Sequence, residues 1–120
     1  MGKICIENFE VYAYHGHLPE ERKIGGNYIV NIELDTAFDK AIVSDELADT
    51  FDYQQACEIV KQEMEIPSSL LEHLVNRIAD RLLKASQLIS SVKVKVSKMN
   101  PPLGGNVKAI SVEIRKVREL

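Results

Sequence analysis

Residues 28–36, where apolar and polar side chains alternate, are the feature that most constrains the fold. Apolar residues occupy every second position from Tyr28 to Leu34, and polar residues such as Asn31 and Glu33 lie between them. Successive side chains of a strand point to opposite faces, so this period of two predicts a β-strand. One face would lie in a core and the other nearer water, as in an antiparallel sheet.

Three further segments have the character of strands. Residues 4–14 are rich in β-branched and aromatic side chains, and a break in their phase near Asn8 predicts a β-bulge. Residues 92–96 alternate valine and lysine strictly, and residues 107–117 form a longer mixed segment. Loops rich in glycine and proline separate the strands of each pair, which predicts two antiparallel hairpins.

Two helices are predicted between the hairpins. Asp52 and Gln55 match a capping box ahead of one apolar stripe at helical spacing, and Ser69 and Glu72 match a second. The resulting order, strand-strand-helix-helix-strand-strand, predicts an α+β fold with a four-stranded antiparallel sheet and both helices on one face. Residues 15–27 are expected to form a loop.

Composition and charge exclude several classes of protein. With 120 residues, 45% hydrophobic and 28% charged, the chain is expected to form a single domain over residues 1–120. A net charge of −3 without a basic stripe argues against nucleic-acid binding. A membrane-spanning helix needs about 20 consecutive apolar residues, and the sequence has no such run. Two cysteines outside any CxxC motif favour a cytoplasmic protein.

The predicted sheet leaves two strand edges exposed. Unpaired edges invite pairing with another copy of the chain. A closed ring of sheets from several subunits would remove those edges, so we expect a homo-oligomer.

Lys98 is the first candidate for chemistry. It continues the apolar phase of Val92, Val94 and Val96, and a partly desolvated amine suits proton transfer. The alternative is a lysine at a strand end whose amine extends to water, which periodicity alone favours.

Other polar residues have competing interpretations. Glu72 suits a helix cap, but its carboxylate could also bind the planar N–H edge of a heterocycle. Tyr53 could pack at a helix start or donate a proton, and Glu21 could be a solvated loop acid or a binding group. His15 and His17 could supply two metal ligands, although the spacing selects no third.

Five short strings together resemble the dihydroneopterin aldolase family. They occur in order between residues 4 and 114 and are Tyr14-His15-Gly16, Glu21, Asp49-Thr50-Phe51-Asp52-Tyr53, Leu70-Leu71-Glu72-His73-Leu74 and Lys98-Met99-Asn100-Pro101-Pro102. The resemblance implies the tunnelling fold, a ββααββ subunit that agrees with the order derived above. It also implies a cyclic tetramer, usually stacked into an octamer, that closes the sheets into a multi-subunit β-barrel.

The resemblance implies a retro-aldol cleavage in folate synthesis. The substrate, 7,8-dihydroneopterin, would give 6-hydroxymethyl-7,8-dihydropterin and glycolaldehyde. The C=N bond of the dihydropterin ring accepts the electrons, so no metal, cofactor or Schiff base is implied. The alternatives are an epimerase of dihydroneopterin or its triphosphate, and a non-catalytic pterin-binding subunit. His17 and the loop 103–106 depart from common members and bear on the balance between cleavage and epimerisation.

Roles for five residues follow from the resemblance. Lys98 would be the catalytic proton donor and acceptor, working through a bound water, with Glu21 near it and near the substrate's trihydroxypropyl chain. Tyr53 would come from a neighbouring subunit and help to protonate the intermediate. Glu72 would bind the N2 and N3 edge of the pterin, and the backbone of Leu71 would add a contact.

Overall fold

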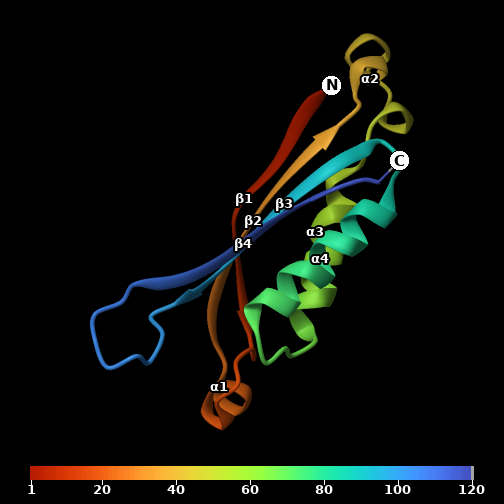
Figure 1. Cartoon of the computed structure of the whole chain (residues 1–120). Helices are drawn as coiled ribbons and strands as arrows, with labels where there is room; N and C mark the ends of the chain where they lie inside the picture. Colours follow the sequence, from red (N-terminus) through yellow and green to blue (C-terminus); the bar gives the residue numbers. More distant parts are fainter. Residues whose placement is uncertain (120) are drawn as a thin grey trace.

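The structure, a computed structural model that describes residues 1–119, contains one antiparallel sheet in the order β1-β2-β3-β4 (Figure 1). The first alternating segment lies within β2 (Gly26–Thr36), and the valine–lysine alternation lies within β3 (Ile89–Met99). These strands occupy the centre, while β1 (Gly2–Ala13) and β4 (Ala109–Val117) form the edges. The two predicted hairpins therefore join side by side into one sheet.

The predicted bulge in β1 is confirmed. The register of β1 against β2 shifts between Ile6 and Phe9, and Asn8 adopts a left-handed conformation with φ of 54°. The freed N–H of Asn8 donates to the side-chain oxygen of Asn31 on β2 at 2.8 Å. The bulge is thus compensated by a cross-strand hydrogen bond.

The two predicted helices are α3 (Tyr53–Glu65) and α4 (Leu71–Ala85), and both cover the same side of the sheet (Figure 1). The apolar stripe of α4 packs against β3 and β4, and that of α3 packs against α4 and β1. The fully buried members of this core include Ala56, Val60, Met64, Leu74, Val75, Ile78, Leu82, Val92, Val94 and Val96. The predicted α+β fold class is confirmed, with both helices on one face.

The two predicted helix caps differ in outcome. The side chain of Asp52 accepts a hydrogen bond from the N–H of Gln54 at 2.9 Å, so Asp52 caps α3 as predicted, but within residues 1–119 Gln55 does not complete the predicted capping box. The predicted cap of α4 at Ser69 is wrong, because Leu70 is the N-cap residue and no side chain caps this helix. The hydroxyl of Ser69 instead accepts a hydrogen bond from Arg22 at 3.3 Å.

Residues 15–27, expected to be a loop, contain the short helix α1 (Pro19–Ile24). Proline at the first helical position presets φ, and the acidic residues Glu20 and Glu21 suit the positive end of the helix dipole. The helix ends at Gly25, whose φ is 78°. The sequence therefore held start and stop signals within a segment that its glycines and polar residues marked as loop.

Two short elements lie at the end of the sheet far from α1 (Figure 1). They are α2 (Asp39–Ser44) and the 3₁₀ helix η1 (Leu47–Asp49). None of the helices within residues 1–119 is long and apolar enough to cross a membrane.

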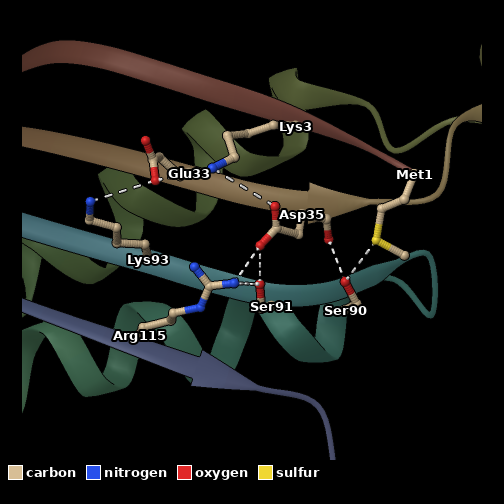
Figure 2. Close-up of polar contacts among 8 residues, drawn as sticks. All are labelled: Met1, Lys3, Glu33, Asp35, Ser90, Ser91, Lys93 and Arg115. Carbon is tan, nitrogen blue, oxygen red and sulfur yellow. Dashed lines mark hydrogen bonds and ion pairs between the residues drawn. The ribbon is translucent and has the colours of Figure 1, made fainter.

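The sheet face that the helices leave uncovered, here called the open face, is polar as predicted (Figure 2). Lys93 on β3 lies 3.7 Å from the carboxylate of Glu33 on β2. Further along the same face, the carboxylate of Asp35 accepts hydrogen bonds from Arg115 at 2.8 Å and from the hydroxyl of Ser91. Cross-strand pairs of this kind stabilise the register of neighbouring strands.

Candidate active site

Lys98 lies near the end of β3, where it is directly opposite Tyr28 of β2. Its side chain is 18% exposed, and its amine donates a hydrogen bond to Oε2 of Glu21, whose side chain is 12% exposed. The sequence placed Lys98 on the core-facing side of the strand, and the structure confirms that position. Glu21 reaches it from α1, so the two site residues form a partly buried ion pair.

Backbone packing around Gly16 allows this approach. Glu21 Oε1 also accepts a hydrogen bond from the N–H of Leu18 at 3.4 Å, which turns the carboxylate back over the segment before α1. A Cβ on Gly16 would lie 2.3 Å from Oε1 of Glu21, and the φ of Gly16 is +135°. The backbone conformation favours glycine at this position, and a Cβ there would displace the Glu21 carboxylate.

The charge of Lys98 controls the ionisation of Glu21. Burial desolvates the carboxylate and opposes its ionisation. The hydrogen bond and positive charge of Lys98 outweigh that effect and lower the pKa of Glu21 below its ordinary value. Glu21 is thus held as a carboxylate at neutral pH, available to accept hydrogen bonds.

The ion pair lines two hollows. One, of about 260 Å³, is lined by Tyr28 and by residues at the ends of α1 and β3. The other, of about 240 Å³, is apolar apart from Glu21 and Lys98 themselves and is lined further by Leu18, Leu71, Pro101, Pro102, Leu103 and Ile110. Small-molecule sites usually occupy about 300–1,000 Å³, so each hollow is small for a complete site.

The remaining predicted site residues fall in two groups. Leu71 lines the second hollow, and Glu72 follows it as an exposed residue of the first turn of α4. Tyr53 begins α3, which runs about 18 Å along its axis before the chain turns back into α4. The structure therefore brings Lys98, Glu21 and Leu71 together, and Tyr53 of the same subunit lies at the far end of the helix pair.

The paired-histidine interpretation is wrong in its geometry. Residues 15 and 17 follow the end of β1 and do not share a strand face, since His15 is completely buried and His17 is exposed. Among residues 1–119 no three His, Cys, Asp or Glu side chains are grouped as metal ligands. His15 and Tyr28 lie near the site, although neither is among the five residues to which the resemblance assigned a role.

Comparisons with known proteins agree with this geometry. The sequence model of the family described as dihydroneopterin aldolase matches residues 4–115. The dihydroneopterin aldolase of Streptococcus pyogenes serotype M18 is 34% identical over 119 residues, covering 98% of this chain and 100% of the relative. That of Bacillus subtilis is 34% identical over 117 residues, covering 97% and 98%.

Solved structures support the same assignment. E. coli dihydroneopterin aldolase in complex with neopterin superposes with a TM-score of 0.88 at 26% identity, covering 97% of this chain and 99% of that one. The ββααββ subunit of the tunnelling fold is thereby confirmed. On fold, sequence and family match together, the chain belongs to the dihydroneopterin aldolase family, the carbon–carbon lyases of folate synthesis.

Proposed function

We propose that this chain cleaves 7,8-dihydroneopterin with Lys98 as the proton donor and acceptor and Glu21 as its partner. The observation that carries the proposal is the ion pair between the Lys98 amine and the Glu21 carboxylate at the edge of an apolar hollow. General acid–base catalysis needs a titratable group within hydrogen-bond reach of the reacting hydroxyl, directly or through one water. Lys98 meets this requirement, because its side chain is largely shielded from solvent and still lines the hollow.

The chemistry proceeds by two proton transfers. Lys98, through a bound water, removes the proton of the 2′-hydroxyl, the C1′–C2′ bond breaks, and the electron pair moves into the C=N bond of the ring. Glycolaldehyde leaves, and the enol-like intermediate then takes a proton at C1′ to give the hydroxymethyl group. Glu21, held ionised, accepts hydrogen bonds from the side-chain hydroxyls and keeps the amine in place.

Glu72 and Leu71 are proposed to hold the pterin ring. Leu71 lines the apolar hollow beside Lys98, and Glu72 is its immediate neighbour in the first turn of α4. A carboxylate can accept two parallel N–H bonds from the N2 and N3 edge of a pterin, and such charge-assisted bonds are short and strong. Because α4 lacks a side-chain cap, Glu72 is not committed to a reciprocal cap with Ser69.

Tyr53 is proposed to act from a neighbouring subunit and to assist protonation of the intermediate. Its side chain is 60% exposed, and in its own subunit the length of α3 separates it from the start of α4. The small open hollows beside Lys98 and the edge strands β1 and β4 suit completion by another copy. We therefore propose a tetrameric ring, stacked into an octamer, with its active sites between subunits.

Residues 1–120 are proposed to act as one domain in the cytoplasm. The two cysteines, Cys5 and Cys57, are both free. Unpaired cysteines suit a reducing compartment.

Product analysis with purified protein and 7,8-dihydroneopterin tests the reaction. We expect release of 6-hydroxymethyl-7,8-dihydropterin and glycolaldehyde that persists in the presence of a strong chelator. Epimerised substrate without cleavage would assign the chain to the epimerase alternative. A folded oligomer that leaves the substrate unchanged would contradict the proposal and favour a non-catalytic subunit.

Mixed oligomers test the placement of Tyr53. Lys98→Ala and Tyr53→Ala subunits, each of low activity alone, would be unfolded and refolded together. A site built from two subunits should recover activity, because roughly a quarter of the sites then combine Lys98 and Tyr53 from different chains. Mixtures no more active than the separate variants would place both residues in one subunit.

A further inference from the structure

His15 is a fully buried polar residue that the proposed reaction does not use. Its Nδ1 accepts a hydrogen bond from the N–H of Ser68 at 3.0 Å, and its ring packs edge-on against Tyr28 with centroids 5.2 Å apart. An imidazole that accepts at Nδ1 while neutral carries its proton on Nε2. Within residues 1–119 that Nε2 has no hydrogen-bond partner, which is unfavourable for a buried polar atom.

A histidine at position 15 can accept a hydrogen bond from the Ser68 N–H, whereas an apolar residue cannot. A leucine could fill the space without burying an unsatisfied Nε2–H. The acceptor atom Nδ1 is therefore the physical reason for a histidine at this position. That acceptor joins the segment after β1 to the loop between α3 and α4, which lies 53 residues away in the sequence.

A second and a third bond complete this junction. The N–H of Gly16 donates to the carbonyl of Ser68 at 2.8 Å, so residues 15 and 16 exchange two hydrogen bonds with one residue. The hydroxyl of Tyr28 donates to the carbonyl of His15 at 2.8 Å. Since Tyr28 lies opposite Lys98 in the sheet, the junction is tied to the strand pair that carries the catalytic amine.

Ser68 is itself held firmly. Arg77 of α4 donates to the Ser68 hydroxyl at 2.7 Å and to the carbonyl of Ile66 at 2.9 Å. The same guanidinium pairs with the buried carboxylate of Glu63 on α3 at 2.6 Å. The two helices thus provide a fixed anchor for His15.

The Glu21 carboxylate lies directly against Gly16. The Glu21 carboxylate rests so closely on Gly16 that a Cβ there would meet both of its oxygens within 3 Å. Any shift of residues 15 and 16 away from Ser68 would remove this support. The carboxylate would then lose its alignment with the Lys98 amine.

We propose that His15 is a positioning residue that, by accepting the Ser68 N–H, fixes Gly16 and through it holds the Glu21 carboxylate against Lys98. The inference rests on the roles proposed above for Lys98 and Glu21. It adds a residue that touches neither substrate nor reacting atoms. His15 acts through the bond of its imidazole to Ser68 and through the backbone of residues 15 and 16.

The charges around the imidazole keep its acceptor atom free. Burial is the largest effect, and the positive charges of Arg77 on α4, Lys98 on β3 and Arg22 on α1 act in the same direction to lower the pKa of His15 to about 4. The carbonyl of Met64 opposes this, although it does not meet hydrogen-bond geometry with Nε2. From β2, Tyr28 presents only its ring edge and hydroxyl. At neutral pH Nδ1 therefore remains an acceptor.

Two substitutions of His15 separate the effect of losing the hydrogen-bond acceptor from the effect of changing the side-chain volume. His15→Leu fills the space without an acceptor, whereas His15→Asn carries an oxygen that can take the Ser68 N–H. His73→Leu, at an exposed position of α4, is the matched control for the chemical change. We expect His15→Leu to lower kcat by about 100-fold with KM changed little, as for small misplacements of catalytic groups. His15→Asn should recover most of kcat, and His73→Leu should leave it unchanged.

A titration of Glu21 gives a readout that does not depend on turnover. With ¹³C-labelled glutamate carboxyls, the pKa of Glu21 should be low in the parent protein and in His15→Asn, and should rise toward its ordinary value in His15→Leu. A folded His15→Leu variant with unchanged kcat and unchanged Glu21 titration would overturn the inference. Full activity of Lys98→Ala would instead reject the proposed role of Lys98, while this titration still tests the position of Glu21.

The parent protein provides a test if His15→Leu does not fold. A through-bond NMR coupling between the Ser68 amide nitrogen and His15 Nδ1, with the proton on Nε2 at pH 7, supports the inference. A proton on Nδ1 at that pH would overturn it, because Nδ1 could not then accept from Ser68.

Discussion

Two lysines of β3, Lys93 and Lys98, differ in surroundings although they share a strand and lie five residues apart. Lys93 points to the open face, where its amine lies 3.7 Å from Glu33 and 3.8 Å from Glu113, and all three side chains are more than a third exposed. Lys98 points to the core side, where it pairs with Glu21, and both side chains are less than a fifth exposed. The parity of the position along the strand thus decides which amine is desolvated.

Whether a lysine of β3 is suited to proton transfer depends on the sheet face to which it points and on its position along the strand. Val92, Val94 and Val96 precede Lys98 on the core side and are completely buried. At Lys98, α1 supplies the carboxylate of Glu21 as the partner of the side chain. Exposed pairs such as those of Lys93 contribute about 0–1 kcal/mol to stability, and the partly buried pair of Lys98 and Glu21 is shielded from solvent more than they are.

The largest expected effect separates these two lysines in catalysis. Lys98→Ala should lower kcat by about 1,000-fold, within the usual range for loss of a general acid–base group, and should largely spare pterin binding. Lys93→Ala is the matched control and should keep kcat within about twofold, as expected for a surface change away from the site. For both variants, steady-state product formation measures kcat, and fluorescence titration with a pterin measures binding. Near-normal turnover in Lys98→Ala would remove it from the mechanism.

The next effect concerns stability toward acid on the core side. The pKa of His15 is about 4 in the folded chain against 6.5 for a free histidine, so the folded state binds fewer protons. Protonation of His15 therefore lowers the free energy of unfolding by about 3 kcal/mol. This stability is fully present above pH 6.5 and is lost as the pH falls from there toward 4. Denaturant unfolding at pH 7 and pH 4.5, for the parent and for His15→Asn, measures it. Equal losses in the two proteins would contradict the buried neutral state of His15.

Substrate binding is expected to show a smaller effect at the start of α4. Glu72→Ala should weaken pterin binding by about 10- to 100-fold, the usual worth of hydrogen bonds to a charged group. The exposed acid Glu65, at the far end of α3 from Tyr53, provides a control, and Glu65→Ala should leave the dissociation constant unchanged. An unchanged pterin affinity in Glu72→Ala would reject the assigned role.

The smallest effect is expected on the open face. Lys93→Ala should lower the free energy of unfolding by about 0.5 kcal/mol, and added salt should reduce that difference, because its two partners are exposed and screened. Denaturant unfolding in low and high salt measures this. A loss of several kcal/mol would show that the open-face charges stabilise the sheet far more than exposed pairs usually do.

Periodicity predicted the elements whose side chains repeat. The four strands, the bulge at Asn8 and the two long helices all follow from a period of 2 or of 3.6. The short helix α1 was missed because six residues are too few for an apolar stripe to develop. The cap at Ser69 was mispredicted because its hydroxyl is taken by Arg22, a contact across 47 positions in the sequence.

The candidate site was predictable only in part, for a similar reason. The phase of β3 placed Lys98 on the core side, and the resemblance to a family named its companions. The pairing of Lys98 with Glu21 spans 77 residues, and no local pattern predicts it. The bond from Ser68 to His15 depends likewise on the packing of α3 and α4 against the segment after β1.

A single-turnover reaction in D₂O tests whether Lys98 carries the proton that reaches C1′. If the Lys98 amine returns a solvent-exchangeable proton to C1′, the 6-hydroxymethyl-7,8-dihydropterin formed must carry one deuterium on its hydroxymethyl carbon. The account predicts this singly labelled product from the parent protein and its near absence from Lys98→Ala. Unlabelled product, or labelled product formed equally fast by Lys98→Ala, would contradict it.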